Sequence, residues 1–478
     1  MDSNSVDDTR HDDLTAAHRR LAHQIGVVLH MGLMMLSAGA SSYRVKDAME
    51  RLAHSIGIDR MYAQVTYTEI SVTAYANGTF RTEIAEQRIL GVNADRIDAL
   101  EHFINSLPPH GLLAEDAERA LTRIERRPAL YSVPLSAFLS GIACAAFAFL
   151  NKGGFSECIA VFIAATCGQC VRRFMMKRHM NHFGTWFVCG VVASFIYIAV
   201  ISAGRYFSLI DATHQTGVVA ALLFLVPGFP LVTAILDLIR QDFSAGISRS
   251  VYVAMLMFSS AMAVWCVTAA LHWSTTSDID GYTLSAGVLL AARCVASFIA
   301  SFGFASLFNA PLRACLIASI NGAIINTFRL SIQDCGFPWL AAVGLAAFAA
   351  GLFAQYAARF CEHSRVSLSV PAVVLMIPGV PFYRALSEIN NGSGALALGE
   401  IVTIVLVISA IGCGLAAARM VTDSSWRVDR TPGLPKLKGS EQTIPPEPSD
   451  GWQEAPAVPR DVPVIGRPKH LKHFKRRH

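Results

Sequence analysis

Two short breaks in otherwise apolar sequence are the first features that could do chemistry. Residues 222–236 read LLFLVPGFPLVTAIL, and residues 373–386 read VVLMIPGVPFYRAL. A proline inside a helix removes a backbone hydrogen bond and clashes with the preceding turn, at a cost of about 3 kcal/mol. In the first turn of a new helix the missing N–H costs nothing. The pattern predicts two half-helices whose free N–H groups face a carboxylate-bearing ligand.

The two breaks correspond residue by residue, because each proline of the first has a partner 151 residues further along the chain. A pair of ordinary proline kinks is the alternative, but the match favours a functional break. Polar residues inside apolar spans are costly and join the candidates, although hydrogen bonding between helices is the more usual role of asparagine there. The predicted substrate-binding residues are Pro227, Gly228, Phe229, Pro230, Pro378, Gly379, Val380, Pro381, Arg293, Asn321 and Asn326.

Three carboxylates in or beside apolar segments are candidates for proton coupling. Asp237 and Glu388 each lie seven residues past the second proline of their break. They either carry protons or sit at the membrane interface beside neighbouring arginines. Glu157 is the third, and we expect it or a substrate carboxylate to pair with Arg293.

The composition is that of a membrane protein. Of the 478 residues, 53% are hydrophobic and 16% are charged, against about 25% charged in soluble domains. The net charge of +5 does not indicate nucleic-acid binding, since the basic residues lie mainly in loops and at the end. Composition and the repeat described below divide the chain into four parts: 1–130, 131–272, 283–420 and 421–478.

Windows of about 20 mainly apolar residues predict ten membrane-spanning helices. Lys and Arg flanking these windows number sixteen on the side of the N-terminus and four on the other side, which predicts that both termini are cytoplasmic. The windows are 131–150, 155–171, 184–203, 216–238, 250–271, 284–304, 311–328, 337–358, 366–387 and 397–418.

A shift of 151 residues places each of the first five windows within a few residues of one of the last five. Because five is odd, the second set enters the membrane from the opposite face. The sequence therefore predicts two inverted five-helix repeats, a plan common among secondary transporters, with the substrate site near the breaks. A channel or ligand-gated pore would share the broken helices and is the alternative of another class.

The two polar ends differ in character. Residues 1–130 predict a small cytoplasmic α+β domain, with helices near 14–38, 92–107 and 113–127, another helix that includes residues 45–53, and two or three strands within 61–85. A membrane span over 21–40 is a rival interpretation of the first helix. The proline-rich, basic segment 421–478 is expected to be disordered, with its end on anionic lipid.

Motifs of enzymes and cofactor sites are missing from the sequence. No G-x-x-x-x-G-K-[ST] loop occurs, which argues against an ATP-driven pump. Ser41, Ser42 and His54 lack the surroundings of a catalytic pair. Cys167 and Cys170 form a lone C-x-x-C within an apolar segment, where packing is the expected role. We therefore expect neither an enzyme nor a metal or other cofactor.

Four stretches together resemble the threonine/serine exporter family. They are LSAGASSYRVKDAMERLAHSIGI (36–58), VPGFPLVTAILDLI (226–239), SAGISR (244–249) and IPGVPFYRAL (377–386). The resemblance runs over about residues 14–420. It implies export of small hydroxy amino acids from a bacterial cytoplasm across the inner membrane, driven by the proton-motive force.

The resemblance also carries an alternative substrate, because relatives divided into two subunits are associated with dicarboxylate (succinate) export. A zwitterionic amino acid asks for a helix N-terminus and an acceptor for its ammonium group, whereas a dicarboxylate asks for two cationic groups. Asp237 and Glu388 favour the first and Arg293 the second. The expected partners are this substrate, protons and the lipid bilayer, and a homo-oligomer is compatible with the sequence.

Overall fold

In a computed structural model of the chain, the structure describes residues 3–87, 90–208, 217–273, 284–361, 363–390 and 392–427. The chain divides into two compact units, residues 1–424 and 425–478. The expectation for the tail therefore falls mostly outside the described residues. The elements before the apolar region are α1 (Ser3–Ser37), α2 (Ser42–Ser55), β1 (Arg60–Val65), β2 (Glu69–Ala76), β3 (Thr79–Glu86), α3 (Ala94–Asn105) and α4 (Ala114–Glu125).

The three strands form one antiparallel sheet in the order β1-β2-β3. The turn between β2 and β3 contains Asn77 and Gly78, both at positive φ (51° and 75°), as tight hairpin turns require. Alternate residues of β2, including Ile70 and Val72, are fully buried, because one face of the sheet is covered by α1. The predicted helices and strands are thus present.

Helix α1 begins at Ser3, earlier than the predicted residue 14. Its apolar residues Ile25, Val28 and Met31 are fully buried, and the helix packs against β2, β3, α2 and α4. It is not among the described helices long and apolar enough to cross a membrane. The apolar run in 21–40 therefore belongs to the core of the N-terminal elements.

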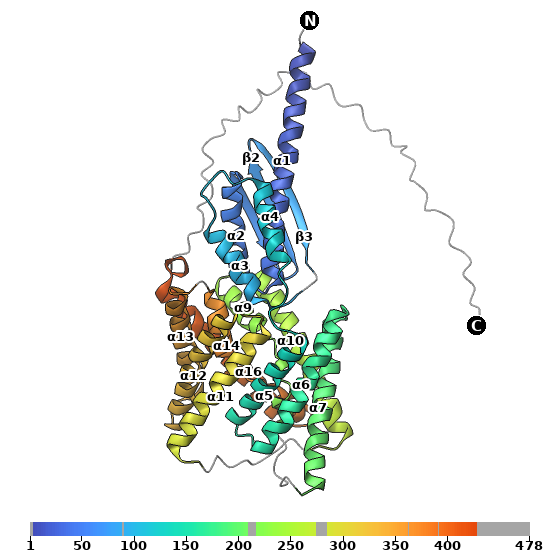
Figure 1. The fold of residues 1–478 in the computed structure, drawn as a ribbon, viewed down its shortest axis with the longest axis vertical. Coiled ribbons are helices and arrows are strands. Elements are labelled where there is room, and N and C mark those ends of the chain that lie inside the picture. Colours follow the sequence, from blue (N-terminus) through green and yellow to red (C-terminus); the bar gives the residue numbers. More distant parts are fainter. Residues whose placement is uncertain are drawn as a thin grey trace, which may run out of the picture. The chain divides into compact units, whose positions relative to one another are not determined.

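The apolar region is a bundle of helices (Figure 1). Among the described residues, eight helices are long and apolar enough to cross a membrane, or nine if a bent pair is one span. The eight are α5 (Val133–Leu150), α6 (Phe155–Lys177), α7 (His182–Tyr206), α10 (Phe243–Ala270), α11 (Ala286–Leu307), α12 (Leu312–Asp334), α13 (Trp339–Ala358) and α16 (Gly394–Thr422).

The two remaining predicted spans are interrupted. The window 216–238 holds α8 (Gly217–Ala220), η1 (Leu223–Leu225) and α9 (Gly228–Ile239). The window 366–387 holds α14 (Arg365–Val374) and α15 (Gly379–Asn390). The structure therefore has at most nine candidate spans among the described residues, one fewer than the ten predicted. The missing one is the second pair, because α14 is a short apolar helix and no joint span with α15 is found.

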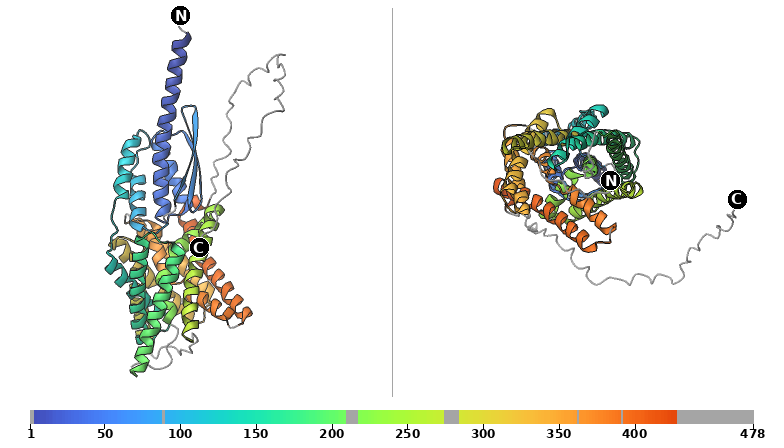
Figure 2. Two further views of the ribbon diagram at one scale, coloured as in Figure 1. Left: turned by 90° about the vertical axis from the view of Figure 1, so that its right-hand side faces the viewer. Right: turned by 90° about the horizontal axis from the view of Figure 1, so that it is seen from below.

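The helices pack in the same pattern in both halves of the bundle. Helix α6 lies against α5 and α7, and α12 lies against α11 and α13. Helices α9 and α10 pack together, as do α15 and α16, and α5 meets α11 between the halves. In Figure 2 the orange helices α15 and α16 stand at the edge of the bundle.

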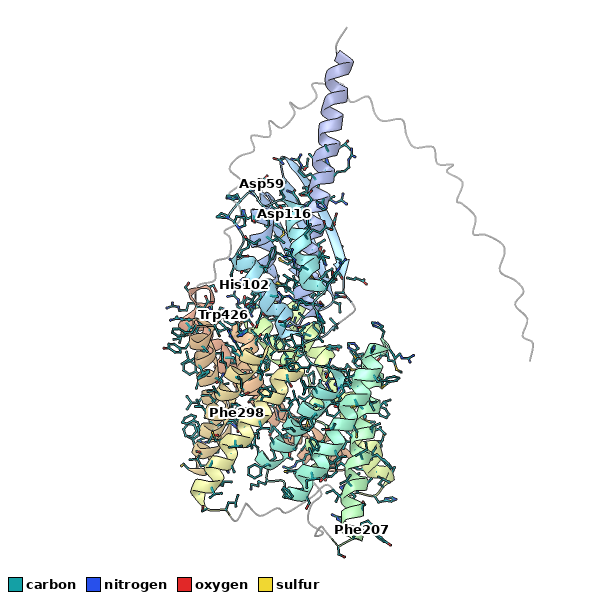
Figure 3. The ribbon with its side chains drawn as sticks, in the orientation of Figure 1. Asp59, His102, Asp116, Phe207, Phe298 and Trp426 are labelled. Atoms are coloured by element: carbon teal, nitrogen blue, oxygen red, sulfur yellow. The ribbon has the colours of Figure 1, made fainter. Side chains whose placement is uncertain are left out.

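The N-terminal elements join one end of the bundle through helix ends. The backbone N–H of Ala94, at the start of α3, donates to Phe308 O at the end of α11 over 2.8 Å. Asp95 N donates to Asn309 O over 3.2 Å. The free amides of one helix thus satisfy the free carbonyls of another. Figure 3 shows His102 of α3 among the N-terminal elements and Phe207, just past α7, at the opposite end of the bundle.

Candidate functional site

The first break separates η1 from α9 and bends the pair by 67°. Pro227 is the N-cap of α9, with φ −78° and ψ 60°. Gly228 N donates to Val226 O over 2.8 Å, and Leu231 N donates to Pro227 O over 3.0 Å. Pro230 lies in the first turn of α9, where its missing N–H needs no partner. The proline pair therefore ends one helix and opens another.

The second break has the same hydrogen bonds 151 residues later. Gly379 N donates to Ile377 O over 2.9 Å, and Phe382 N donates to Pro378 O over 3.4 Å. Helix α15 begins at Gly379 and includes Pro381 in its first turn. The side chain of Val380 lies outside the described residues. The local sequence thus produces the same turn at both places.

The two breaks contact each other across the bundle. A β-carbon on Gly228 would lie 2.7 Å from Val374 Cγ2, at the end of α14. A β-carbon on Gly379 would lie 3.3 Å from Leu223 Cδ2, at the start of η1. Val374 is 151 residues beyond Leu223, so the two contacts are equivalent by the repeat. Glycine allows the backbone of each break to approach the other.

A cavity of about 190 Å³ lies beside the first break. This is smaller than the roughly 300–1,000 Å³ of pockets for drug-sized ligands, so it suits a small metabolite. Its walls come from α6, α7, α10, α11, the segment 223–227 with Pro230, and residues of the N-terminal elements. The residues of the second break are not among its described lining.

Two side chains of the cavity bond to the backbone carbonyls that the first break leaves free. Arg172 Nη1 donates to Phe224 O, and Trp186 Nε1 donates to Leu225 O over 2.6 Å. The Arg172 guanidinium also lies over the Trp186 ring, 5.1 Å from its centroid. These contacts satisfy the broken backbone where no helix can.

The second arginine of the cavity is less completely bonded. Arg173 Nη2 donates to Ser136 Oγ over 2.9 Å. Its Nε is buried and makes no hydrogen bond among the described residues. Buried polar groups are nearly always paired, so Arg173, which lines the cavity, keeps one unused hydrogen-bond donor.

The cavity is electropositive and partly aromatic. Its described lining contains two arginines and no Asp or Glu. On another wall Tyr252 Oη lies 2.6 Å from His182 Nδ1, and its ring centroid lies 5.1 Å from that of Tyr67. A small molecule with a carboxylate fits this arrangement, since guanidinium groups recognise carboxylates in a fixed geometry.

Asp237 lies at the end of α9 in a fully buried ion pair with Arg249 of α10. The Asp237 Oδ2 to Arg249 Nη1 distance is 3.4 Å, and both side chains are 0% exposed. Arg249 Nη2 donates to Ala40 O over 2.9 Å, and its guanidinium lies 5.0 Å from the Tyr67 ring centroid. Arg249 Nε makes no hydrogen bond among the described residues. The pair thus links the bundle to the N-terminal elements.

The other oxygen of Asp237 caps α2. Asp237 Oδ1 accepts from Ser42 N over 2.9 Å and from Ser42 Oγ over 3.1 Å. Ser42 Oγ also lies 2.9 Å from Asp242 Oδ2, and Asp242 pairs with Lys46. A carboxylate at a helix N-terminus satisfies free amides and complements the helix dipole. The motif at 36–58, which contains Ser42, therefore attaches the N-terminal elements to the bundle.

Arg293 has a partner other than the one expected. It lies in α11 and pairs with Asp334 at the end of α12, so the expected pairing with Glu157 is wrong. Glu157 lies in the first turn of α6, fully buried. Its Oε2 accepts from Gly154 N over 2.8 Å, and its Oε1 accepts from Tyr197 Oη over 3.4 Å.

The asparagines join helices, as their usual role suggests. Asn321 Nδ2 donates to Ala350 O and to Leu368 O, each over 3.2 Å. Asn326 Nδ2 donates to Ser297 Oγ over 2.8 Å. Glu388 lies in α15 with a half-buried side chain. None of these three lines the cavity, so the structure brings together the two breaks but not the other predicted residues.

Sequence reasoning missed the residues that give the cavity its chemistry. Arg172 and Arg173 entered only as two of the sixteen basic residues counted beside the predicted spans, although two arginines at the end of an apolar run could have suggested an anion site. Tyr67, Trp186 and Tyr252 carry no sequence signal, because they meet only through the packing of distant elements.

Comparison with known proteins places the chain in one family. The family described as "Putative threonine/serine exporter" matches residues 26–271. The family described as "Threonine/Serine exporter, ThrE" matches residues 293–421. No solved structure matches.

The curated relatives that carry a functional name are distant and have two kinds of name. The "Threonine/serine exporter" of Corynebacterium glutamicum is 20% identical over 86% of this chain and 84% of its own length. The "Probable succinate transporter subunit YjjP" of Escherichia coli is 25% identical over 49% of this chain and 90% of its own length. Because one family match alone covers half of the chain, the protein belongs to the threonine/serine exporter family of membrane transporters.

Proposed function

We propose that this protein exports threonine and serine from a bacterial cytoplasm across the inner membrane, as a secondary transporter driven by the proton-motive force. The observation that carries the proposal is the small cavity at the first break, which offers arginines to a carboxylate and the aromatic wall of Tyr67 and Tyr252 to an ammonium group. The family membership supports the substrate class. An electropositive site of this size selects a small molecule by its carboxylate.

The binding mode follows from the donors that the cavity offers. The substrate carboxylate lies against Arg173, whose buried Nε is unpaired among the described residues. The ammonium group lies against the aromatic wall of Tyr67 and Tyr252, where ring faces and the Tyr252 hydroxyl attract a cation. The side-chain hydroxyl of threonine or serine faces the backbone near Pro227.

Succinate is the second candidate, and a specific observation favours it. Two guanidinium groups without a compensating lining carboxylate suit a dianion better than a zwitterion. The relative named as a succinate transporter subunit agrees with this reading. The two candidates differ at the aromatic wall, which contacts an ammonium group in one case and a methylene or carboxylate in the other.

We also propose that residues 131–272 and 283–420 are inverted five-helix repeats, with residues 1–130 and both termini in the cytoplasm. The equivalent contacts of Gly228 and Gly379 support this arrangement, as do the matching helix neighbours of the two halves. Such repeats exchange conformations to expose a central site to either side. The breaks are the parts whose geometry would change.

For proton coupling we propose Asp237, with Arg249 as its partner. Protonation of Asp237 would leave Arg249 buried without a counter-charge, so the protonated and ionised states require different positions of the arginine. Such a two-state element can couple a proton to a movement of α9. Glu157 and Glu388 remain predicted coupling residues.

The test uses proteoliposomes containing the purified protein. An imposed proton gradient is applied, and accumulation of labelled threonine, serine and succinate is compared. Uphill accumulation of threonine and serine supports the proposal and excludes a channel, which only equilibrates its solute. Movement of succinate alone would transfer the assignment to the dicarboxylate.

A further inference from the structure

One wall of the cavity belongs to the N-terminal elements and not to the bundle. Tyr67, in the turn between β1 and β2, lines the cavity together with Gly91 and Val92. Its side chain is buried between bundle residues, with Arg249 5.0 Å and the Tyr252 ring 5.1 Å from its ring centroid. Tyr67 N donates to Ser248 Oγ over 3.2 Å. Burial raises the pKa of Tyr67 to about 12, so its hydroxyl stays neutral.

The N-terminal elements are tied to the bundle by helix caps in both directions. Asp237 of the bundle caps α2 through Ser42. In return, Asp98 of α3 accepts from Ser364 N over 3.0 Å at the start of α14. Asp98 also accepts from Ser367 Oγ over 3.0 Å. Asp237, which caps α2, belongs to the half-helix after the first break. Asp98 caps α14, which is the half-helix before the second break.

These ties differ in kind. At the α3–α11 junction, two backbone amides bond to backbone carbonyls, and Asn309 Nδ2 donates to Asn93 Oδ1 over 2.9 Å. At α2 the backbone N–H and the hydroxyl of Ser42 bond to side chains of the bundle, and the pair of Lys46 with Asp242 is partly exposed, at 34% and 19% of the side chains. Partly exposed ion pairs exchange readily with water. The first tie has the character of a hinge and the second that of a latch.

We propose that the N-terminal elements are the gate of the transport cavity at this end, with Tyr67 as the residue that closes it and contacts the substrate. Opening swings Tyr67 away from Tyr252 about the α3–α11 junction and releases Ser42 from Asp237 and Asp242. The inference rests on the proposed transport function, and it assigns to the N-terminal elements a part of the substrate site itself.

The first experiment locks the latch. Ser42 and Asp242 are replaced together by cysteine, because their side chains are in hydrogen-bond contact. After oxidation to the disulfide, export from proteoliposomes should fall at least tenfold, and reduction should restore it. Ser42→Cys alone and Asp242→Cys alone, treated with the same oxidant, control for the eleven native cysteines. Undiminished export by a fully cross-linked double variant would overturn the gate.

The second experiment needs no transported substrate. Met176, which lines the cavity, is replaced by cysteine, and its labelling by a membrane-impermeant thiol reagent is timed against a parent with only native cysteines. Adding Tyr67→Ala should speed labelling severalfold, whereas Tyr67→Phe keeps the ring and should not. Tyr62→Ala is the matched control, because Tyr62 lies 49% exposed on the same sheet. Equal labelling with and without Tyr67→Ala would refute the closing role.

The two readouts separate the possible failures. If the wild type moves neither threonine, serine nor succinate, the proposed function fails, and faster labelling in Tyr67→Ala still supports the gate. If the wild type transports and both the locked and the Tyr67→Ala proteins behave as their controls, the gate fails and the transporter assignment stands.

Discussion

Replacing Asp237 by asparagine tests the buried ion pair at the end of α9. Asparagine keeps the size of the side chain and can still accept from Ser42 N, which Asp237 Oδ1 does over 2.9 Å. It removes the charge that faces Arg249, whose side chain is 0% exposed. We expect a stable fold with a weakened connection between α9, α10 and the N-terminal elements.

The expected magnitude follows from the burial of both partners. Removing one partner of a buried ion pair typically costs about 3–5 kcal/mol, because the other charge is left uncompensated. The retained bond to Ser42 places Asp237→Asn near about 3 kcal/mol at the lower end of that range. Arg249→Met should cost about the same, because Asp237 then stays buried with only its Ser42 bonds.

The double variant Asp237→Asn/Arg249→Met removes both charges together. It still loses the bond of Arg249 to Ala40 O and the contact with the Tyr67 ring, each about 1 kcal/mol. We therefore expect a total of about 2 kcal/mol, and not the sum of about 6 kcal/mol for the two single variants. Thermal unfolding of the purified wild type, single variants and double variant in the same detergent measures their relative stabilities.

Additive losses in the double variant would refute the ion pair as the reason for the destabilisation.

A second readout of Asp237→Asn addresses proton coupling. If Asp237 carries the proton, Asp237→Asn exchanges labelled substrate across the bilayer at near wild-type rates but does not accumulate it against a gradient. Uphill accumulation by Asp237→Asn would move the coupling role to Glu157 or Glu388.

Three further perturbations probe the cavity and its frame. Arg173→Gln removes a charge-assisted contact of about 1.5–3 kcal/mol. It should therefore weaken substrate binding to the purified protein roughly 10- to 150-fold. Arg178→Gln is the control, because Arg178 lies outside the described lining of the cavity, and it should leave substrate binding unchanged. Asn321→Leu loses two interhelical hydrogen bonds and should lower stability in detergent by about 1 kcal/mol while transport persists; complete loss of transport would contradict a purely structural role. Gly228→Ala places a β-carbon 2.7 Å from Val374 and should cost about 1–3 kcal/mol, whereas Gly184→Ala, with no atom within 4 Å, should be neutral in the same unfolding assay.

The breaks were predictable from sequence because their cause is local. Proline and glycine act on their own backbone, so Pro227 and Pro378 mark the turns wherever the chain folds. The offset of 151 residues then connected the breaks, and the contact of Gly228 with Val374 agrees with that connection. The small sheet was equally local, since alternation and the Asn77-Gly78 turn define it.

Partners that meet only in the folded chain were beyond the sequence. Ser42 and Asp237 are 195 residues apart, and no spacing rule links them. The partner of Arg293 was misjudged because Asp334 lies 41 residues away on another helix, where only the packing of α11 on α12 brings the two together. The proximity of Arg173 to the first break likewise depends on how α6 packs.

The helix-end junctions also bear on how the two halves of the protein find each other. Helix α3 precedes the first half in the chain, yet it joins the ends of α11 and α14 in the second half through Ala94 and Asp98. Noncovalent contacts therefore join the N-terminal elements to the second half of the bundle. Two polypeptides produced by dividing the gene between Trp273 and Leu284 should assemble into a working complex in the membrane. In such a complex the capping contacts of α3 with α11 and α14 would be the contacts by which the two subunits recognise each other.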